Sequence, residues 1–276
     1  LIFSMAATGD GTDPNSAFMQ WGWRIPFLFS AVLVLIGLWI RLSVEETPVF
    51  RQGKAAITES PARTLPFLDA MKFQWREILI AGGALTSLFS FFYIGTSFLT
   101  SYGTAQLGHS RSFVLTTGLV AAVFFAITIA ASAIYSDKIG RRKVIGASCA
   151  LAIAFSLVMF PLLNSGSGLL FAITVCVTLG IMGIAYGPAG AALPEMFEAR
   201  YRYTGAGLGY NLAGILGGAL PPLAASQLVA SGNSLGVGVM LACLSAISVV
   251  CVLLMKESSS NEIHATAEPD VVVAAP

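Results

Sequence analysis

Hydroxyl-bearing residues recur along one stretch of the chain. The set follows spacings of four, three, four and three residues: Thr86, Ser90, Tyr93, Ser97 and Thr100. In a regular α-helix these positions share one stripe about 80° wide. Such a stripe predicts the polar wall of a water-filled cavity that binds a polar or anionic solute. Packing between helices is the alternative, since Ser and Thr are common where membrane helices meet; the large Tyr93 side chain favours the cavity.

Two later stretches carry stripes of small residues. The first is Cys176, Gly180, Gly183, Gly187 and Gly190, and the second is Gly207, Asn211, Gly214, Gly218 and Pro221. Small faces let helices approach closely and slide, although tight static packing explains them equally well. The amide of Asn211 needs hydrogen-bond partners at membrane depth, on a neighbouring helix or on a solute. With Tyr186 and Tyr210, Asn211 completes the predicted solute-binding set.

Two charged turns form a second group of candidate residues. In Ser136-Asp-Lys-Ile-Gly-Arg-Arg142, the glycine permits a tight turn, and the aspartate caps a helix or pairs with a cation. The segment 194–205 offers Glu195 and Arg202 as an ion pair. A surface pair contributes only ~0–1 kcal/mol, so a latch needs several groups together. The predicted cytoplasmic gate comprises Asp137, Gly140, Arg141, Arg142, Glu195 and Arg202.

Seven near-uncharged apolar stretches position these groups. They cover roughly 24–43, 78–100, 113–135, 144–163, 168–190, 205–230 and 235–255. Each is long enough to cross a ~30 Å hydrocarbon core as a helix. Only helices and closed barrels can hydrogen-bond all of their backbone polar groups within that core. With 56% hydrophobic and 11% charged residues, the chain departs far from the ~25% charge of soluble domains. The sequence predicts an all-α membrane protein with seven transmembrane helices.

The connections between the apolar stretches predict a domain organisation. Residues 1–23 are an extracytoplasmic lead-in after a truncated helix, because the first seven residues resemble the end of an apolar segment. Residues 44–77 form a cytoplasmic linker, which is too long for an ordinary helix connection. Residues 78–255 form a six-helix bundle, and the polar segment 256–276 is a disordered tail. The chain is therefore expected to be a fragment of a longer protein.

The positive charges predict the orientation in the cell membrane. Lys and Arg gather in segments 41–76 and 136–143, whereas segments 164–167 and 231–234 have neither. Because cytoplasmic loops carry the excess of positive charge, the N-terminus lies outside and the C-terminus lies in the cytoplasm.

Several functional classes lack the residues they need. No ionisable residue lies deep in a predicted span, so a proton relay of this fragment's own is not expected. The same absence argues against a retinal protein, which needs a Schiff-base lysine, and against an intramembrane enzyme, which needs buried carboxylates or histidines. His109 and His264 lie in a loop and the tail, and the four cysteines lie in apolar spans, so no metal site or cofactor is expected. A net charge of +1 does not favour nucleic acid.

The turn from Asp137 to Arg142 resembles the loop motif G-x-x-x-D-[RK]-x-G-R-R of the major facilitator superfamily, with Ala133 at the first glycine position. Segments 21–30 (WGWRIPFLFS), 41–50 (RLSVEETPVF) and 202–210 (RYTGAGLGY) look like the metabolite:proton symporter family within it. The resemblance covers nearly the whole chain.

This resemblance implies that 24–43 is helix 6 and 78–255 are helices 7–12 of a twelve-helix transporter. It implies proton-coupled symport, by alternating access, of a small polar or anionic metabolite such as an organic acid or a betaine. The N-terminal half, with its coupling carboxylates, and the lipid bilayer are then partners. A sugar or drug carrier of the same superfamily is the alternative. A seven-helix receptor is more remote, because it does not explain the Asp137–Arg142 turn or the long linker.

Overall fold

The computed structural model describes residues 18–43, 66–198 and 200–255. Within these ranges every regular element is a helix, which confirms the predicted all-α membrane protein. Seven helical stretches are long and apolar enough to span a membrane: Gln20–Ser43, Trp75–Ala105, Arg111–Ile139, Arg141–Leu163, Gly168–Glu195, Arg202–Ala230 and Ser234–Leu254. The predicted lead-in before residue 18, linker residues 44–65 and the tail 256–276 lie outside the described residues.

Most spans are longer than the apolar pattern predicts. Helix α7 covers Arg111–Ile139, where the apolar stretch is 113–135, and the bundle begins at Trp75 instead of residue 78. These helices end in polar and charged residues, because the helical backbone hydrogen bonds continue beyond the last apolar side chain. The linker also contains a short helix, α4 (Pro66–Phe73), which the sequence prediction missed.

The described helices belong to two compact units. In the first, a π-helical turn η1 (Phe18–Gly22) leads into α2 (Arg24–Ser43), which matches the predicted span 24–43. The guanidinium of Arg24 lies 4.5 Å from the ring centre of Trp23 and donates a 2.6 Å hydrogen bond to the Gln20 carbonyl. Aromatic rings and arginine at the start of an apolar helix are typical of the membrane–water boundary.

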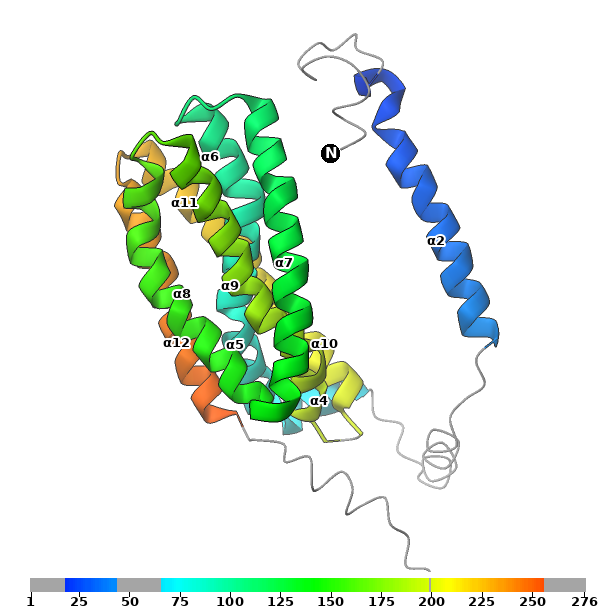
Figure 1. Cartoon of the computed structure of the whole chain (residues 1–276). Coiled ribbons are helices and arrows are strands. Elements are labelled where there is room, and N and C mark those ends of the chain that lie inside the picture. The colour runs from blue at the N-terminus through cyan, green and yellow to red at the C-terminus, as the bar shows by residue number, and fades with distance from the viewer. Residues whose placement is uncertain (1–17, 44–65, 199, 256–276) are drawn as a thin grey trace, which may run out of the picture. The chain divides into compact units, whose positions relative to one another are not determined.

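The second unit is a bundle of long helices that run side by side (Figure 1). After α4 and α5 (Trp75–Tyr93), the chain continues through η2 (Ile94–Phe98) and α6 (Leu99–Ala105) to α7. The remaining elements are α8 (Arg141–Leu163), α9 (Gly168–Glu195), α10 (Arg202–Ala213), η3 (Gly214–Ala219), α11 (Leu220–Ala230) and α12 (Ser234–Leu254). Helix α5 contacts α9, α10, η3 and α12, so it lies at the centre of the bundle.

Short turns with helix caps set the helix ends. The side chains of Ser110, Ser167 and Asn233 accept backbone N–H bonds at the starts of α7, α9 and α12. Gly140 separates α7 from α8 with φ of 107°, a conformation that disfavours any side chain. The prediction that Gly140 permits this turn is therefore confirmed.

Two spans of the bundle contain a π-helical segment, η2 in its first span and η3 in its fifth. Helix α5 packs against η3, and α11 packs against η2, so the two irregular segments lie in adjacent parts of the bundle. A π-segment changes the rotation per residue, so side chains after it no longer follow the face expected for a regular α-helix.

Candidate functional site

The predicted hydroxyl stripe is divided between the protein interior and its surface. Thr86 and Ser90 are buried, and their hydroxyls donate to the carbonyls of Gly82 and Thr86 at 2.8 Å. Their side of α5 is covered, since a Cβ at Gly217 of η3 would collide with the carbonyl oxygen of Thr86. The structure therefore corrects the prediction of one cavity-facing stripe. These two hydroxyls serve helix packing in this structure.

The C-terminal part of the same span exposes hydroxyl groups. Its exposed positions after Leu79 are Tyr93, Thr96, Ser97, Ser101 and Ala105. Thr100, by contrast, is half-buried and donates to the Thr96 carbonyl at 2.7 Å. Thr96 donates in turn to the Phe92 carbonyl at 2.6 Å, beside η2. The sequence pattern missed Thr96, which lies in η2 and is exposed next to Ser97.

Three tyrosines from three helices converge beside these hydroxyls. Tyr93 of α5, Tyr186 of α9 and Tyr210 of α10 are 38%, 39% and 41% exposed. Tyr186 and Tyr93 both lie near the phenol of Tyr210, and the rings of Phe92 and Phe125 connect Tyr93 with Tyr186. We call these three residues the tyrosine cluster. The sequence named all three, and the fold brings them together across about 120 residues of chain.

The tyrosine cluster packs against phenylalanine rings. Phe89 meets Tyr210 edge-on with ring centres 4.8 Å apart, and Phe92 meets Tyr93 in the same way at 5.4 Å. Phe125 of α7 lies 6.2 Å from Phe92 and 6.0 Å from the ring of Tyr186. Such contacts restrict the ring orientations, so packing within the bundle sets the positions of the three hydroxyls.

A wide groove extends from Tyr210, one member of the tyrosine cluster, toward the start of α10. Its volume is about 1030 Å³, and α9 and α10 form most of its walls, with Phe67 of α4 at its edge. The predicted residues Arg202, Tyr210 and Asn211 all line it. The amide of Asn211 donates to the carbonyl of Gly207 at 2.8 Å, which satisfies one of its groups within α10.

The two charged turns meet at the α7–α8 junction. Arg141 forms ion pairs with Glu195 and, at 3.2 Å, with Asp137. The side chains of Arg141 and Glu195 are 31% and 25% exposed, whereas Asp137 is 66% exposed. Glu195 thus pairs with Arg141 and not with Arg202 as the sequence suggested, because Arg202 begins α10 and faces the groove. Arg142 donates to the carbonyl of Leu253, so it joins α8 to the end of α12.

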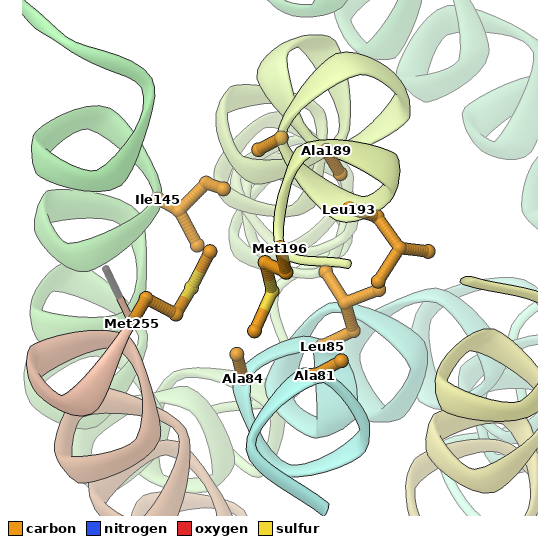
Figure 2. Close-up of a pocket in the computed structure, with 9 residues that line it drawn as sticks. Ala81, Ala84, Leu85, Ile145, Ala189, Leu193, Met196 and Met255 are labelled. Atoms are coloured by element: carbon orange, nitrogen blue, oxygen red, sulfur yellow. The ribbon is translucent and has the colours of Figure 1, made fainter. Parts of the chain in front are cut away.

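An apolar contact lies behind this ion-pair group. Figure 2 shows Met196 and Met255 converging with Ile145, Leu193 and alanines from α5 and α9. The contact leaves a void of about 10 Å³ with entirely apolar side chains. A void of this size and lining stays dry and holds no solute. The flexible methionines fill an irregular gap where four helix ends meet.

Within the described residues, no cluster of three or more His, Cys, Asp and Glu side chains is arranged to hold a metal ion. The polar groups of the site are hydroxyls, one amide and the charges of the turns. They are suited to hydrogen bonding of a solute and to a charge-based latch.

A family model for the major facilitator superfamily matches residues 16–220. The chain belongs to this superfamily. The match includes the tyrosine cluster, the Asp137–Arg141–Glu195 group and η3, so the site described above lies within the family's own sequence pattern.

Named relatives have transport functions. The chain is 36% identical, over 88% of its length and 56% of the relative, to the inner membrane metabolite transport protein YhjE of Escherichia coli. It is 34% identical to the shikimate transporter of the same species, with the same coverage of both chains. A proline/betaine transporter of Salmonella typhimurium is 26% identical over 88% of this chain and 50% of its own length. The chain thus spans about half the length of the curated relatives it matches.

Proposed function

We propose that this chain is the C-terminal half, with one preceding helix, of a secondary transporter. The transporter moves a small polar or anionic metabolite, an organic acid or a betaine-like zwitterion, by proton-coupled symport. Relatives named for metabolites, shikimate and proline/betaine support this solute class. The observation that carries the proposal is the convergence of Tyr93, Tyr186 and Tyr210 on an exposed, hydroxyl-bearing face of the most central helix.

The tyrosine cluster suits such a solute chemically. Phenol hydroxyls donate to a carboxylate, and ring faces attract an ammonium group, so one cluster can hold both ends of a zwitterion. Ser97, Thr96 and Asn211 add neutral hydrogen-bonding groups at its sides. No group of the cluster carries a charge, so we expect the proton-coupling carboxylates in the part of the relatives that this chain does not cover.

The ion-pair group of Asp137, Arg141 and Glu195 is proposed as part of the cytoplasmic gate. It connects the α7–α8 turn to the end of α9, at the end of the bundle where Arg202 enters the groove. Alternating access requires helix ends to separate in one state and meet in the other. Breaking one link of the group would change the balance between these states.

The proposed function is tested by uptake into proteoliposomes that contain the full-length protein. Labelled shikimate, proline, glycine betaine, a dicarboxylate, a sugar and a cationic drug are each supplied with and without an inward proton gradient. We expect one of the first four to accumulate above its external concentration only when the gradient is present. Gradient-independent uptake would reject symport, and uptake of only sugars or cationic drugs would support the alternative carrier class.

The proposed orientation has its own test. In a cysteine-free background, Ser165→Cys lies in the α8–α9 turn and Lys138→Cys lies at the end of α7; both side chains are exposed. An impermeant thiol reagent should label position 165 on intact cells and position 138 only after permeabilisation. The reverse pattern would show that the N-terminus faces the cytoplasm.

A further inference from the structure

A second cavity opens at the end of the bundle opposite the charged turns. Its walls come from the end of η2 with α6 and from α11, and Figure 1 shows α6 and α11 at the end away from α4 and α10. Its volume is about 170 Å³, many times the ~10–15 Å³ that one water molecule requires. It shares no lining residue with the groove along α10. We call this cavity the α6–α11 pocket.

Two aromatic residues line the α6–α11 pocket. The rings of Phe98 and Tyr102 are stacked, with their centres 5.7 Å apart and an angle of 18° between their planes. The hydroxyl of Tyr102 donates to Oδ1 of Asn164 at 2.6 Å, and the side-chain amide of Asn164 donates to the hydroxyl of Ser234 at 2.9 Å. Tyr102 is 6% exposed. The end of α8 and the start of α12 therefore hold this ring in place.

Two polar side chains of the pocket have unused hydrogen-bonding capacity. On the same span, the hydroxyls of Thr96, Thr100 and Thr104 each donate to the backbone carbonyl four residues earlier. By contrast, the hydroxyl of Ser101 and the side-chain amide of Gln106 have no hydrogen-bond partner among the residues that the structure describes. Both residues are exposed and line the pocket. Their donors and acceptors are therefore available to water or to a solute.

Exposed positions connect the pocket with the tyrosine cluster. Tyr93, Ser97 and Ser101 are spaced four residues apart and are all exposed. The ring of Tyr93 also lies against Gly218 of η3, which continues into α11 and reaches Ser226 on the opposite wall of the pocket. Ser101 lies eight residues beyond Tyr93, a rise of about 12 Å along a helix. The pocket and the cluster thus lie between the same two spans, and the pocket is nearer to the helix ends.

We propose that the α6–α11 pocket is a first binding site for the solute, separate from the tyrosine cluster. The amide of Gln106 and the hydroxyl of Ser101 donate to a carboxylate, and the rings of Phe98 and Tyr102 contact the ammonium group or the apolar part of the solute. All four groups are neutral, so the pocket suits a small zwitterion or organic acid that binds weakly and moves on. In the proposed orientation this end of the bundle faces the outside. The inference rests on the proposed function for its class of solute.

The first test measures whether solute protects a cysteine in the pocket. In a cysteine-free full-length protein, Ala105→Cys places a thiol at an exposed position of the pocket wall, and Ser165→Cys is the control in the α8–α9 turn. A maleimide is applied to the protein in lipid nanodiscs, which leave both sides open, with increasing shikimate, proline, glycine betaine or dicarboxylate. We expect the transported solute to slow labelling at position 105 and not at position 165. Equal slowing at both positions, or none at position 105, would overturn the inference.

The second test separates the pocket from the tyrosine cluster. The double change Ser101→Ala/Gln106→Leu should raise the solute concentration that half-protects position 105 by about 2- to 13-fold for each hydrogen bond lost. Tyr93→Phe should leave this concentration unchanged while it weakens uptake. Thr104→Val is the matched control, because the Thr104 hydroxyl already bonds its own helix.

The outcomes of these tests distinguish the pocket from the proposed function. A shift of half-protection by Tyr93→Phe as large as that from the double change would mean that protection comes from solute bound at the cluster, and the pocket would not be a site. Uptake by the unmodified protein without protection at position 105 would overturn this inference alone. No uptake of any of the four solutes would overturn the proposed function, and this inference with it.

Discussion

Helices α5 and α7 both have the composition of membrane spans, but they expose opposite kinds of residue. Of the most apolar window in the α5 span, 78% is buried, against 17% for α7. Four of the five exposed positions after Leu79 in the α5 span carry hydroxyls, whereas the exposed positions of α7 include Val123, Phe124 and Ile127. Hydropathy therefore does not distinguish a helix whose exposed side carries hydroxyls from one whose exposed side is apolar. That difference is seen only in the residues left exposed on the folded bundle.

The difference follows from how each helix is held. Helix α5 is surrounded by α9, α10, η3 and α12, which leaves only one narrow side free. Helix α7 packs mainly on α9, where Gly183 and Gly187 bring the two backbones together. Its other sides are exposed in this chain and mostly apolar. Hydroxyls on the single free side of a central helix would gain nothing from lipid, which supports their proposed contact with solute.

The close crossing of α7 and α9 should be the most sensitive part of this comparison. At Gly187, a Cβ would lie 2.7 Å from the Ile129 carbonyl oxygen and 2.8 Å from the Ala133 nitrogen, which are backbone atoms. Gly187→Ala should therefore force the helices apart and cost about 1–3 kcal/mol. We expect a lower yield of monodisperse protein after heating, measured by size-exclusion chromatography. Gly190→Ala is the control, since nothing lies within 4 Å of its Cβ position; equal losses would contradict the assigned crossing.

The ion-pair group should show an intermediate effect. Glu195→Gln removes the charge that pairs with Arg141, a change of about 1–2 kcal/mol for a part-buried charged hydrogen bond. In the full-length protein the maximal transport rate should fall several-fold, while the half-saturating solute concentration stays within about twofold. Glu198→Gln changes the same charge at an exposed site three residues further on. A change confined to half-saturation would place Glu195 at the solute site instead.

The buried hydroxyls of α5 should have the smallest effect on solute binding. Thr86→Val removes only the bond from the Thr86 side chain to the Gly82 carbonyl. That carbonyl lies inside a regular helix, so the loss should cost less than about 1.5 kcal/mol of stability. Half-saturation for transport should not change. A clear rise would show that Thr86 reaches the solute in another state and would restore the full stripe.

Local sequence rules predicted the elements better than the site. The seven spans follow from length and apolar content, and the Gly140 turn follows from the backbone freedom of glycine. The stripe prediction treated residues 86–100 as one regular helix, and η2 changes the rotation between Tyr93 and Thr100. Burial of Thr86 depends on Gly217, 131 residues away, which no local pattern reveals. Helix α4 is short, and a long loop with prolines gave no periodic pattern from which to predict it.

The sequence also could not predict which distant residues contact one another. Glu195 and Arg202 are neighbours in sequence, but the fold brings Arg141 to Glu195 and turns Arg202 into the groove. Conversely, Tyr93, Tyr186 and Tyr210 were named singly, and only the packing of α5, α9 and α10 shows that they form one cluster.

The central claim is that the tyrosine cluster on the free side of α5 binds the solute, and Tyr93→Phe tests it most directly. The change removes one hydroxyl and keeps the ring that packs on Phe92 and Gly218. Measured by uptake in the full-length protein, apparent affinity should fall about 2- to 13-fold, which corresponds to ~0.5–1.5 kcal/mol. Tyr135→Phe makes the same change on the 62%-exposed surface of α7 and should leave affinity unchanged. Equal effects of the two variants, or no effect at Tyr93, would contradict the assignment.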